Sequence, residues 1–278
     1  MAKILDGKVV AQKIKDEVKE YVADCPNKIS LTIVQVGDNP ASNTYVKNKC
    51  KACEDVGIAS SVNKLQEDIG QEILKTEIDF ENYLTNGLML QLPLPSGLDE
   101  RKLLDCIDPG VDADCLTTRS LGEFYSSNNP SIAPCTAQGI IDLLDYYDIP
   151  IEGKHAVVVG RSNIVGKPIA HLLTCRNATV TVCHSKTPNL SEFTKQADIL
   201  VVAIGKSKHI TADMVKPRAV VIDVGINRDE DGKLCGDVDF EQVKSMASAI
   251  TPVPGGIGPM TVAELLKNTV KLHTIQNN

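Results

Sequence analysis

Three residues in the first third of the chain could together bind a polar substrate and move a proton. Tyr45 and Lys49 stand four residues apart in a helical pattern, so their side chains share one face. Gln91 lies in the apolar run 88–92, and the carboxyl ends of parallel strands are where open α/β sheets bind ligands. By spacing alone, Lys49 could equally be a solvated helix lysine, and Gln91 a strand-end residue that satisfies the backbone.

A second set of residues could bind a phosphate. The apolar run 155–159 leads into Gly160, Arg161 and Ser162, and Gly166 follows just before a helical pattern. A tight glycine turn between a strand and a helix points backbone N–H groups and the helix dipole at a phosphate. The spacing is neither the usual G-x-G-x-x-G nor a P-loop, so a turn that binds no nucleotide is an alternative.

The residues after the next strand favour one cofactor over another. A NAD site usually carries Asp or Glu there to bind the ribose 2′-hydroxyl. In this chain the run 179–183 is followed by His184, Ser185 and Lys186, with no carboxylate. Arg161 and Lys186 could each be an ordinary surface charge. Together with the Ser185 hydroxyl they suit a 2′-phosphate, so the sequence favours NADP.

Alternating strand and helix patterns would position these residues. Strands separated by helices predict parallel sheets with right-handed crossovers. We therefore expect an α/β fold of two lobes with parallel sheets, the second a Rossmann-like dinucleotide-binding domain, and an active-site cleft between them. The runs typical of strands are residues 29–36, 58–62, 88–92, 155–159, 179–183, 199–203 and 220–224.

The composition excludes several other classes of protein. Hydrophobic residues make up 42% of the 278 and charged residues 23%, as in a soluble globular protein. The net charge of −7 argues against a general nucleic-acid binder, and no apolar run is long enough for a signal peptide or a membrane span. The nine cysteines and five histidines show no spacing typical of a disulfide scaffold or metal site, and Cys50 and Cys53 form a lone pair. We therefore expect no metal, reduced thiols and a cytoplasmic location.

Seven stretches of the sequence resemble the methylenetetrahydrofolate dehydrogenase/methenyltetrahydrofolate cyclohydrolase family. They occur in the family's order and extend over nearly the whole chain. The proline–glycine block near the end and the Y-x-x-x-K pair are highly specific together. The stretches are residues 39–49 (NPASNTYVKNK), 91–95 (QLPLP), 134–136 (PCT), 159–162 (VGRS), 183–186 (CHSK), 223–227 (DVGIN) and 252–261 (PVPGGIGPMT).

The resemblance implies a bifunctional enzyme of folate one-carbon metabolism. Such an enzyme oxidises 5,10-methylenetetrahydrofolate to 5,10-methenyltetrahydrofolate with NADP, and then hydrolyses that product to 10-formyltetrahydrofolate. It also implies tetrahydrofolate derivatives as ligands and a homodimer. The alternatives are a dehydrogenase alone, a NAD-dependent enzyme, and a regulatory module that kept the fold without catalysis. The presence of Lys49 and Gln91 argues against the last.

The resemblance also assigns roles to individual residues. Lys49 looks like the family's catalytic lysine, Tyr45 its pterin-stacking partner and Gln91 the residue that tunes the lysine. Asp114 looks like the carboxylate that binds the pterin and completes the catalytic set. The positions that match NADP-binding residues are Gly160, Arg161, Ser162, Ser185 and Ile226, and those that match the folate-lining block are Pro254, Gly255, Gly256 and Ile257.

In the family the last helix packs back on the first lobe. We therefore expect residues 1–138, completed by a C-terminal helix over 261–278, to form the catalytic, folate-binding domain. Residues 139–260 would form the NADP-binding domain, with the junction near Pro134 and the helix that follows it.

The sequence departs from the family's pattern at two places. The family commonly reads D-V-D-G where this chain has Asp112, Ala113, Asp114 and Cys115. If that glycine has a positive φ in relatives, Cys115 would be strained there. The residues that follow align Asp114, rather than Asp112, with the pterin ligand. Ala137 stands where proline is usual, and we expect no consequence from it.

Overall fold

The computed structural model describes residues 2–277, which divide into two compact units. Residues 2–12 and 136–261 form one, here called the six-stranded unit, and residues 13–135 and 262–277 form the other, the three-stranded unit. The six-stranded unit thus takes in residues 2–12 as well as the whole of the range 139–260. Among the described residues, no helix is long and apolar enough to span a lipid bilayer.

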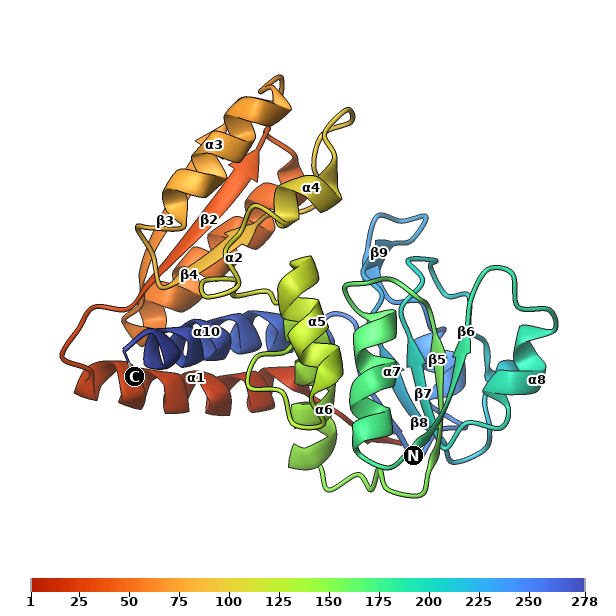
Figure 1. The fold of residues 1–278 in the computed structure, drawn as a ribbon. Coiled ribbons are helices and arrows are strands. Elements are labelled where there is room, and N and C mark those ends of the chain that lie inside the picture. The colour runs from red at the N-terminus through yellow and green to blue at the C-terminus, as the bar shows by residue number, and fades with distance from the viewer. Residues whose placement is uncertain (1, 278) are drawn as a thin grey trace. The chain divides into compact units, whose positions relative to one another are not determined.

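A parallel sheet forms the centre of the six-stranded unit (Figure 1). Its central strands are apolar and buried along almost their whole length, as expected of a sheet covered on both faces. The order is β1-β11-β8-β7-β5-β6. The bounds are β1 Lys3–Ile4, β5 His155–Val159, β6 Thr179–Cys183, β7 Ile199–Val202, β8 Val220–Asp223 and β11 Ala249–Ile250.

Short helices and a small hairpin complete this unit. Helix α7, Gly166–Cys175, follows β5 and contacts β5 and β6, so its N-terminus lies near the carboxyl end of β5. The hairpin pairs β9, Asn227–Arg228, with β10, Leu234–Cys235, in antiparallel register. The remaining elements are α8 Leu190–Thr194, η1 Ala212–Met214 and α9 Phe240–Val243.

The three-stranded unit contains a smaller parallel sheet in the order β3-β2-β4. The central strand β2, Ser30–Val36, is buried, and it pairs with β3, Ala59–Leu65, on one side and β4, Gly87–Leu90, on the other. This arrangement confirms the parallel pairing expected from the pattern. The helices between and after the strands are α2 Pro40–Val56, α3 Gln71–Glu81, α4 Glu100–Leu104 and α5 Thr118–Ser126.

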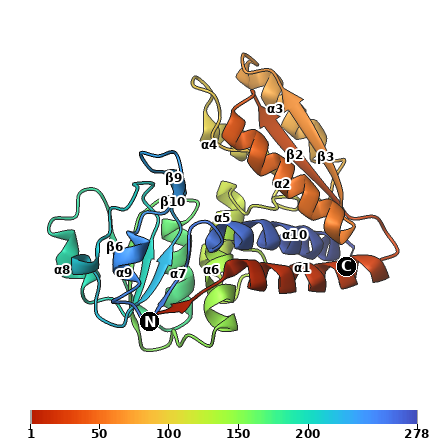
Figure 2. The same cartoon turned by 180° about the vertical axis from the view of Figure 1, so that it is seen from behind.

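Three longer helices complete the chain: α1, Gly7–Asp24; α6, Cys135–Tyr146; and α10, Ile257–Gln276. Helices α1 and α10 run side by side in both views (Figures 1 and 2), and in the three-stranded unit Tyr21 Oη lies 2.9 Å from Thr274 Oγ1. Apolar residues recur every four positions along α1. Val10, Ile14 and Val18 are each 5% exposed or less, and Val22 is partly buried.

Candidate active site and cofactor pocket

Helix α2 carries Lys49 on its buried face. Asn39 caps the helix by accepting the N–H groups of Ala41 and Ser42, and Gly57 ends it with a φ of 84°. The buried positions recur every three or four residues, and Lys49 occupies one of them with only 8% of its surface exposed. A lysine is ordinarily excluded from such a position, so the helix holds this amine inside the unit.

The Lys49 amine is held by neutral groups. Its Nζ donates to Oε1 of Gln91 at 3.0 Å and lies 3.4 Å from Sδ of Met89. Gln91 directs its other amide atom, Nε2, to the carbonyl of Leu92 at 2.6 Å, which fixes the oxygen toward the lysine. Among residues 2–277, no carboxylate forms an ion pair with Lys49. The structure therefore brings together Lys49 and Gln91, two of the residues that the sequence singled out.

Tyr45 lies one turn before Lys49 and is 38% exposed. Its ring is thus accessible at the surface of the three-stranded unit, as a residue that stacks on a ligand must be. Partial burial raises the pKa of the Tyr45 hydroxyl, so at neutral pH it is a hydrogen-bond donor rather than an anion.

Asp112 and Asp114, the two aspartates of the segment that differs from the family's D-V-D-G, lie in different surroundings. Asp112 is buried, and its Oδ2 accepts the backbone N–H of Thr117 at 2.8 Å. Burial raises the pKa of the Asp112 carboxyl, against the hydrogen bonds from Thr117, Ser120 and Leu116 that lower it. Asp114 is only partly buried. Asp112 thus shapes the turn, while the carboxylate of Asp114 stays accessible to a ligand.

Cys115 has the backbone conformation that glycine favours. Its φ is 57°, and its side chain is 1% exposed. A cysteine there is strained because its Cβ crowds the backbone in the left-handed region. Burial raises the pKa of its thiol far above the usual range, which makes the sulfur an unreactive packing group. The strain expected from the missing glycine is therefore present.

Helix α10 holds this turn in place through a residue that the sequence did not single out. Asn268 is buried, and its Nδ2 donates to the carbonyls of Ala113 at 3.0 Å and Ala133 at 2.9 Å. The Cys135 thiol also lies 3.4 Å from the Ala113 carbonyl. The sequence signal that could have identified Asn268 is an asparagine among the apolar positions of the last helix.

The glycine turn after β5 is packed too closely for any other residue. Gly160 has a φ of 134°, and a Cβ there would collide with the carbonyl of Ala203. A Cβ on Gly166 would collide with the Gly160 carbonyl. Ser162 Oγ accepts the N–H groups of Val165 at 3.2 Å and Gly166 at 3.3 Å, and so caps the start of α7.

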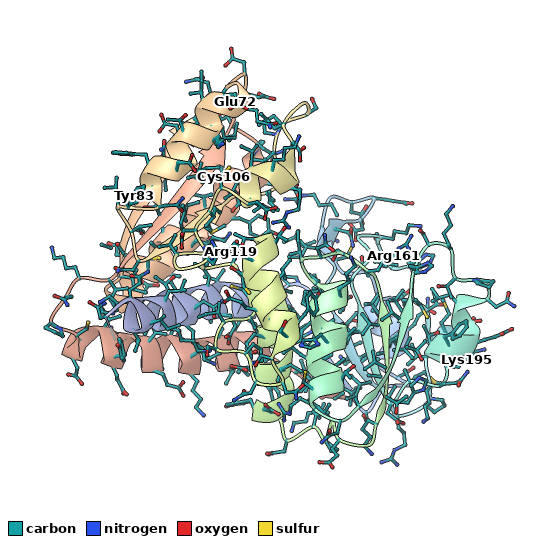
Figure 3. All side chains as sticks on the ribbon, viewed as in Figure 1. Glu72, Tyr83, Cys106, Arg119, Arg161 and Lys195 are labelled. Carbon is teal, nitrogen blue, oxygen red and sulfur yellow. The ribbon has the colours of Figure 1, made fainter. Side chains whose placement is uncertain are left out.

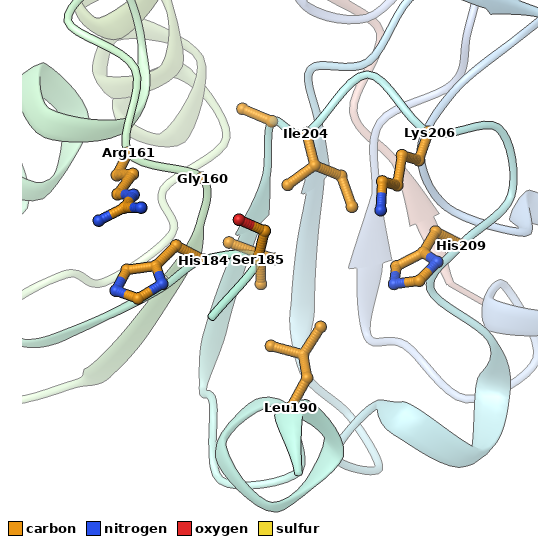
Figure 4. Close-up of a pocket in the computed structure, with 10 residues that line it drawn as sticks. Gly160, Arg161, His184, Ser185, Leu190, Ile204, Lys206 and His209 are labelled. Atoms are coloured by element: carbon orange, nitrogen blue, oxygen red, sulfur yellow. The ribbon is translucent and has the colours of Figure 1, made fainter. Parts of the chain in front are cut away.

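A cavity of about 260 Å³ opens beside this turn, within the six-stranded unit (Figure 4). Arg161 and His184 lie on one side of it and Ser185 near its centre, while Lys206 and His209 lie on the other side. Arg161, labelled in Figure 3, is exposed, and it forms no ion pair within residues 2–277. The lining residues are Val159, Gly160, Arg161, His184, Ser185, Leu190, Ala203, Ile204, Lys206 and His209.

Three of the five cofactor residues expected from the resemblance line this cavity: Gly160, Arg161 and Ser185. Ser162 takes the capping role described above, and Ile226 is 47% exposed and does not line the cavity. Lys206 and His209 were not anticipated. They follow β7, and the rule that ligands bind at the carboxyl ends of parallel strands could have found them.

The block expected to line a folate site is built around a close chain crossing. Gly255, with a φ of 108°, accepts the N–H of Gly7 at 2.9 Å. A Cβ on Gly7 would collide with the Gly256 carbonyl, and a Cβ on Gly256 would collide with the carbonyl of Pro252, so only glycine fits at these two positions. Pro254 is exposed, whereas Ile257 is buried at the start of α10.

The residues present fit a phosphorylated nucleotide better than a metal. An apolar cavity beside a glycine turn, lined by cations and a hydroxyl, suits a nucleoside with a phosphate on its ribose. No carboxylate lies among the lining residues. Within residues 2–277, no three His, Cys, Asp or Glu side chains are grouped so that they could hold a metal ion, and all nine cysteines are free.

Two family models match the chain. The catalytic domain of tetrahydrofolate dehydrogenase/cyclohydrolase matches residues 5–114, and the NAD(P)-binding domain of the same family matches residues 134–277. A relative from Agathobacter rectalis, named bifunctional protein FolD, is 52% identical over 277 residues, which are 98% of this chain and 99% of the relative.

Solved structures are similar over the same length. The bifunctional FolD methylenetetrahydrofolate dehydrogenase/cyclohydrolase of Campylobacter jejuni has a TM-score of 0.96 and 46% identity, over 99% of this chain and 100% of that one. A methylenetetrahydrofolate dehydrogenase-cyclohydrolase from Trypanosoma brucei, complexed with NADP and an inhibitor, has a TM-score of 0.94 and 37% identity, over 100% of this chain and 99% of that one.

Proposed function

The chain belongs to the tetrahydrofolate dehydrogenase/cyclohydrolase family, and on that premise we propose that it is a bifunctional, NADP-dependent enzyme of one-carbon metabolism. It oxidises 5,10-methylenetetrahydrofolate to 5,10-methenyltetrahydrofolate and hydrolyses that product to 10-formyltetrahydrofolate. The observation that carries the proposal is the buried Lys49 amine, whose hydrogen-bond partners among residues 2–277 are the amide oxygen of Gln91 and the thioether of Met89.

In the oxidation, bound NADP supplies the acceptor for the hydride. The residues of the chain supply position, because hydride transfer depends on orientation more than on acid–base chemistry. Arg161 and Ser185, which line the cavity, would bind the 2′-phosphate, and the turn at Gly160 would bind the pyrophosphate. Ser162 and Ile226 take part in holding the same cofactor.

In the hydrolysis, water attacks the methenyl carbon and loses a proton. The bond from that carbon to N5 then breaks and N5 takes up a proton, so one proton is released for each water consumed. The amine of Lys49 accepts the proton of the attacking water, and Gln91 directs the amine through its 3.0 Å hydrogen bond. Tyr45 stacks on the pterin and Asp114 accepts its adjacent N–H donors, because a carboxylate can accept two donors at once. The block Pro254, Gly255, Gly256 and Ile257 lines the folate site.

We assign folate binding to residues 1–138 with 261–278 and NADP binding to residues 139–260. The family resemblance further supports a homodimer, and the reduced thiols support a cytoplasmic location. Sedimentation of the purified protein tests the dimer, since a monomer at micromolar concentration would refute it.

The activity is tested by adding methylenetetrahydrofolate with NADP or with NAD and following the absorbance of the methenyl product. Rapid appearance with NADP, followed by decay above the uncatalysed rate, is the expected result. Appearance without accelerated decay would indicate a dehydrogenase alone, and the absence of both would refute catalysis.

Lys49→Met tests the assigned mechanism. The variant should lose the hydrolysis and keep part of the oxidation, because the lysine accepts a proton only in hydrolysis, so the methenyl product should accumulate. Lys47→Met is the matched control, since that lysine is exposed on the same helix. Normal hydrolysis by Lys49→Met would remove the lysine from the mechanism.

A further inference from the structure

A buried carboxylate lies behind one wall of the cofactor cavity. Asp237, which follows β10, has no exposed surface. Its Oδ2 accepts the N–H groups of Ile204 at 2.7 Å and Gly205 at 3.1 Å, and its Oδ1 accepts that of Lys206 at 2.7 Å. Three successive backbone donors therefore converge on one side chain, and two of the residues that carry them line the cavity.

The backbone of this wall has the curvature of an anion-binding nest. Gly205 has a φ of 64°, between neighbours whose N–H groups point the same way. Such a concavity attracts an anion. Asp237 fills this concavity from the interior of the unit and so fixes the backbone of residues 204–206. The opposite side of the same segment faces the cavity.

A second buried carboxylate fixes Asp237 itself. Asp223, at the end of β8, accepts the N–H groups of Asp237 and Val238, each at 2.9 Å. Gly225 and Gly236 have no room for a Cβ, because it would collide with the carboxylates of Asp237 and Asp223, respectively. The position of Asp237 is therefore determined on every side by the fold.

Asp237 also reaches a second part of the expected cofactor site. Its Oδ1 accepts Nδ2 of Asn227 at 2.9 Å, and Asn227 directly follows Ile226. One carboxylate is thus bonded to the segment after β7 and to the segment after β8, the carboxyl ends of two neighbouring strands.

The geometry points to Asp237 as a positioning residue for NADP, which fixes the wall formed by Ile204 and Lys206 and, through Asn227, the place of Ile226. This role rests on the proposed function, because it assumes that the cavity receives the cofactor. It touches no ligand itself. The carboxylate is needed because an amide has a single acceptor oxygen and cannot accept three N–H groups and a side-chain amide.

Asp237→Asn should raise the KM for NADP about tenfold or more, since misplaced or unsatisfied buried donors weaken binding by that order. The KM for the folate substrate should stay at the wild-type value. Asp239→Asn is the matched control, because Asp239 lies two residues on and only caps α9. An unchanged KM for NADP in a folded Asp237→Asn protein would overturn the role.

A double-mutant cycle with Lys206→Ala separates positioning from general loss of structure. If Asp237 acts through the wall, its substitution should matter less once Lys206 is removed, whereas unrelated structural damage would be additive and refute the role. If Asp237→Asn does not fold, Asn227→Ala is the milder variant to use. It should weaken NADP binding measurably. An unchanged affinity for NADP would contradict the link to Ile226. Calorimetric titration with NADP alone keeps this test independent of the folate chemistry.

Discussion

Arg161 is the residue on which the choice of cofactor depends most directly. It lines the cavity with its charge unpaired by any acid of residues 2–277, and no lining carboxylate would repel a 2′-phosphate. Charge-assisted hydrogen bonds contribute about 1.5–3 kcal/mol, so Arg161→Ala should lower kcat/KM for NADP about tenfold or more. The value for NAD should change little. Lys195→Ala, an exposed cation that does not line the cavity, serves as control.

Equal losses of kcat/KM for the two cofactors in Arg161→Ala would show that the guanidinium does not bind the 2′-phosphate. In that case the side chain would contribute to binding of the shared part of both dinucleotides.

We expect Asp112 to contribute to the stability of the fold and Asp114 to contribute to substrate binding. Asp114→Ala should raise the KM for folate and impair both activities, with little change in stability, because its carboxylate is partly exposed. Asp112→Ala should instead lower the free energy of unfolding by about 1–3 kcal/mol, since the buried N–H of Thr117 loses its acceptor. Thermal unfolding and substrate titration of both variants measure the two effects. The opposite order would mean that the two carboxylates have been assigned the wrong way round.

Lys49 and Cys115 illustrate what single residues reveal before a structure is known. On sequence alone Lys49 could be a solvated helix lysine. Its position in the buried stripe of α2 conflicts with the hydrophobic pattern, and such conflicts mark functional or strained sites. The positive φ of Cys115 was foreseeable only because the family carries glycine there. The hydrogen bond from Lys49 to Gln91 joins residues 42 positions apart and could not be derived from spacing.

At the scale of elements, helix α10 supports the site from a distance in sequence. Asn268→Ala would leave the carbonyls of Ala113 and Ala133 without this donor, and should raise the KM for folate by loosening the turn that carries Asp114. Stability should also fall, by about 1–3 kcal/mol. Asn277→Ala makes the same change near the exposed end of the segment and should be neutral. An unchanged KM in Asn268→Ala would separate α10 from the substrate turn.

The strands predicted from continuous apolar runs are present, and the short ones were missed for a physical reason. Strands β1 and β11 have two residues each, too few for any periodicity, and they exist because they pair with each other and with β8. The hairpin of β9 and β10 is equally short. The hydrogen bonds that the N–H groups of Ile204 and Lys206 donate to Asp237 join residues 33 and 31 positions apart, so no local pattern contains them.

At the scale of the whole molecule, the buried acids link the stability of the fold to pH. Burial raises the pKa of the Asp223 carboxyl from its ordinary value of 3.8 to about 7, against the N–H groups of Val238 and Asp237 that lower it. Burial raises the pKa of Asp112 as well. Between the ordinary pKa of Asp223 and its raised pKa in the fold, the folded protein holds a proton that the unfolded chain has released. The contribution of these acids to the free energy of unfolding therefore falls as the pH rises from about 4 to about 7.

Asp223→Asn should flatten that dependence, because an amide does not titrate in this range. The slope lost should be at most about 1.4 kcal/mol per pH unit, the value for one proton. Absolute stability should also fall, since the amide has one acceptor oxygen for three backbone donors, so the slopes rather than the stabilities are compared.

Urea unfolding followed by circular dichroism suits a chain without tryptophan. Asp198→Asn is the control, because the hydrogen bond from Lys216 lowers the pKa of Asp198 and keeps its titration below this window. If Asp223→Asn keeps the wild-type slope, the proton is bound elsewhere, and the Asp223 carboxylate is ionised throughout the range.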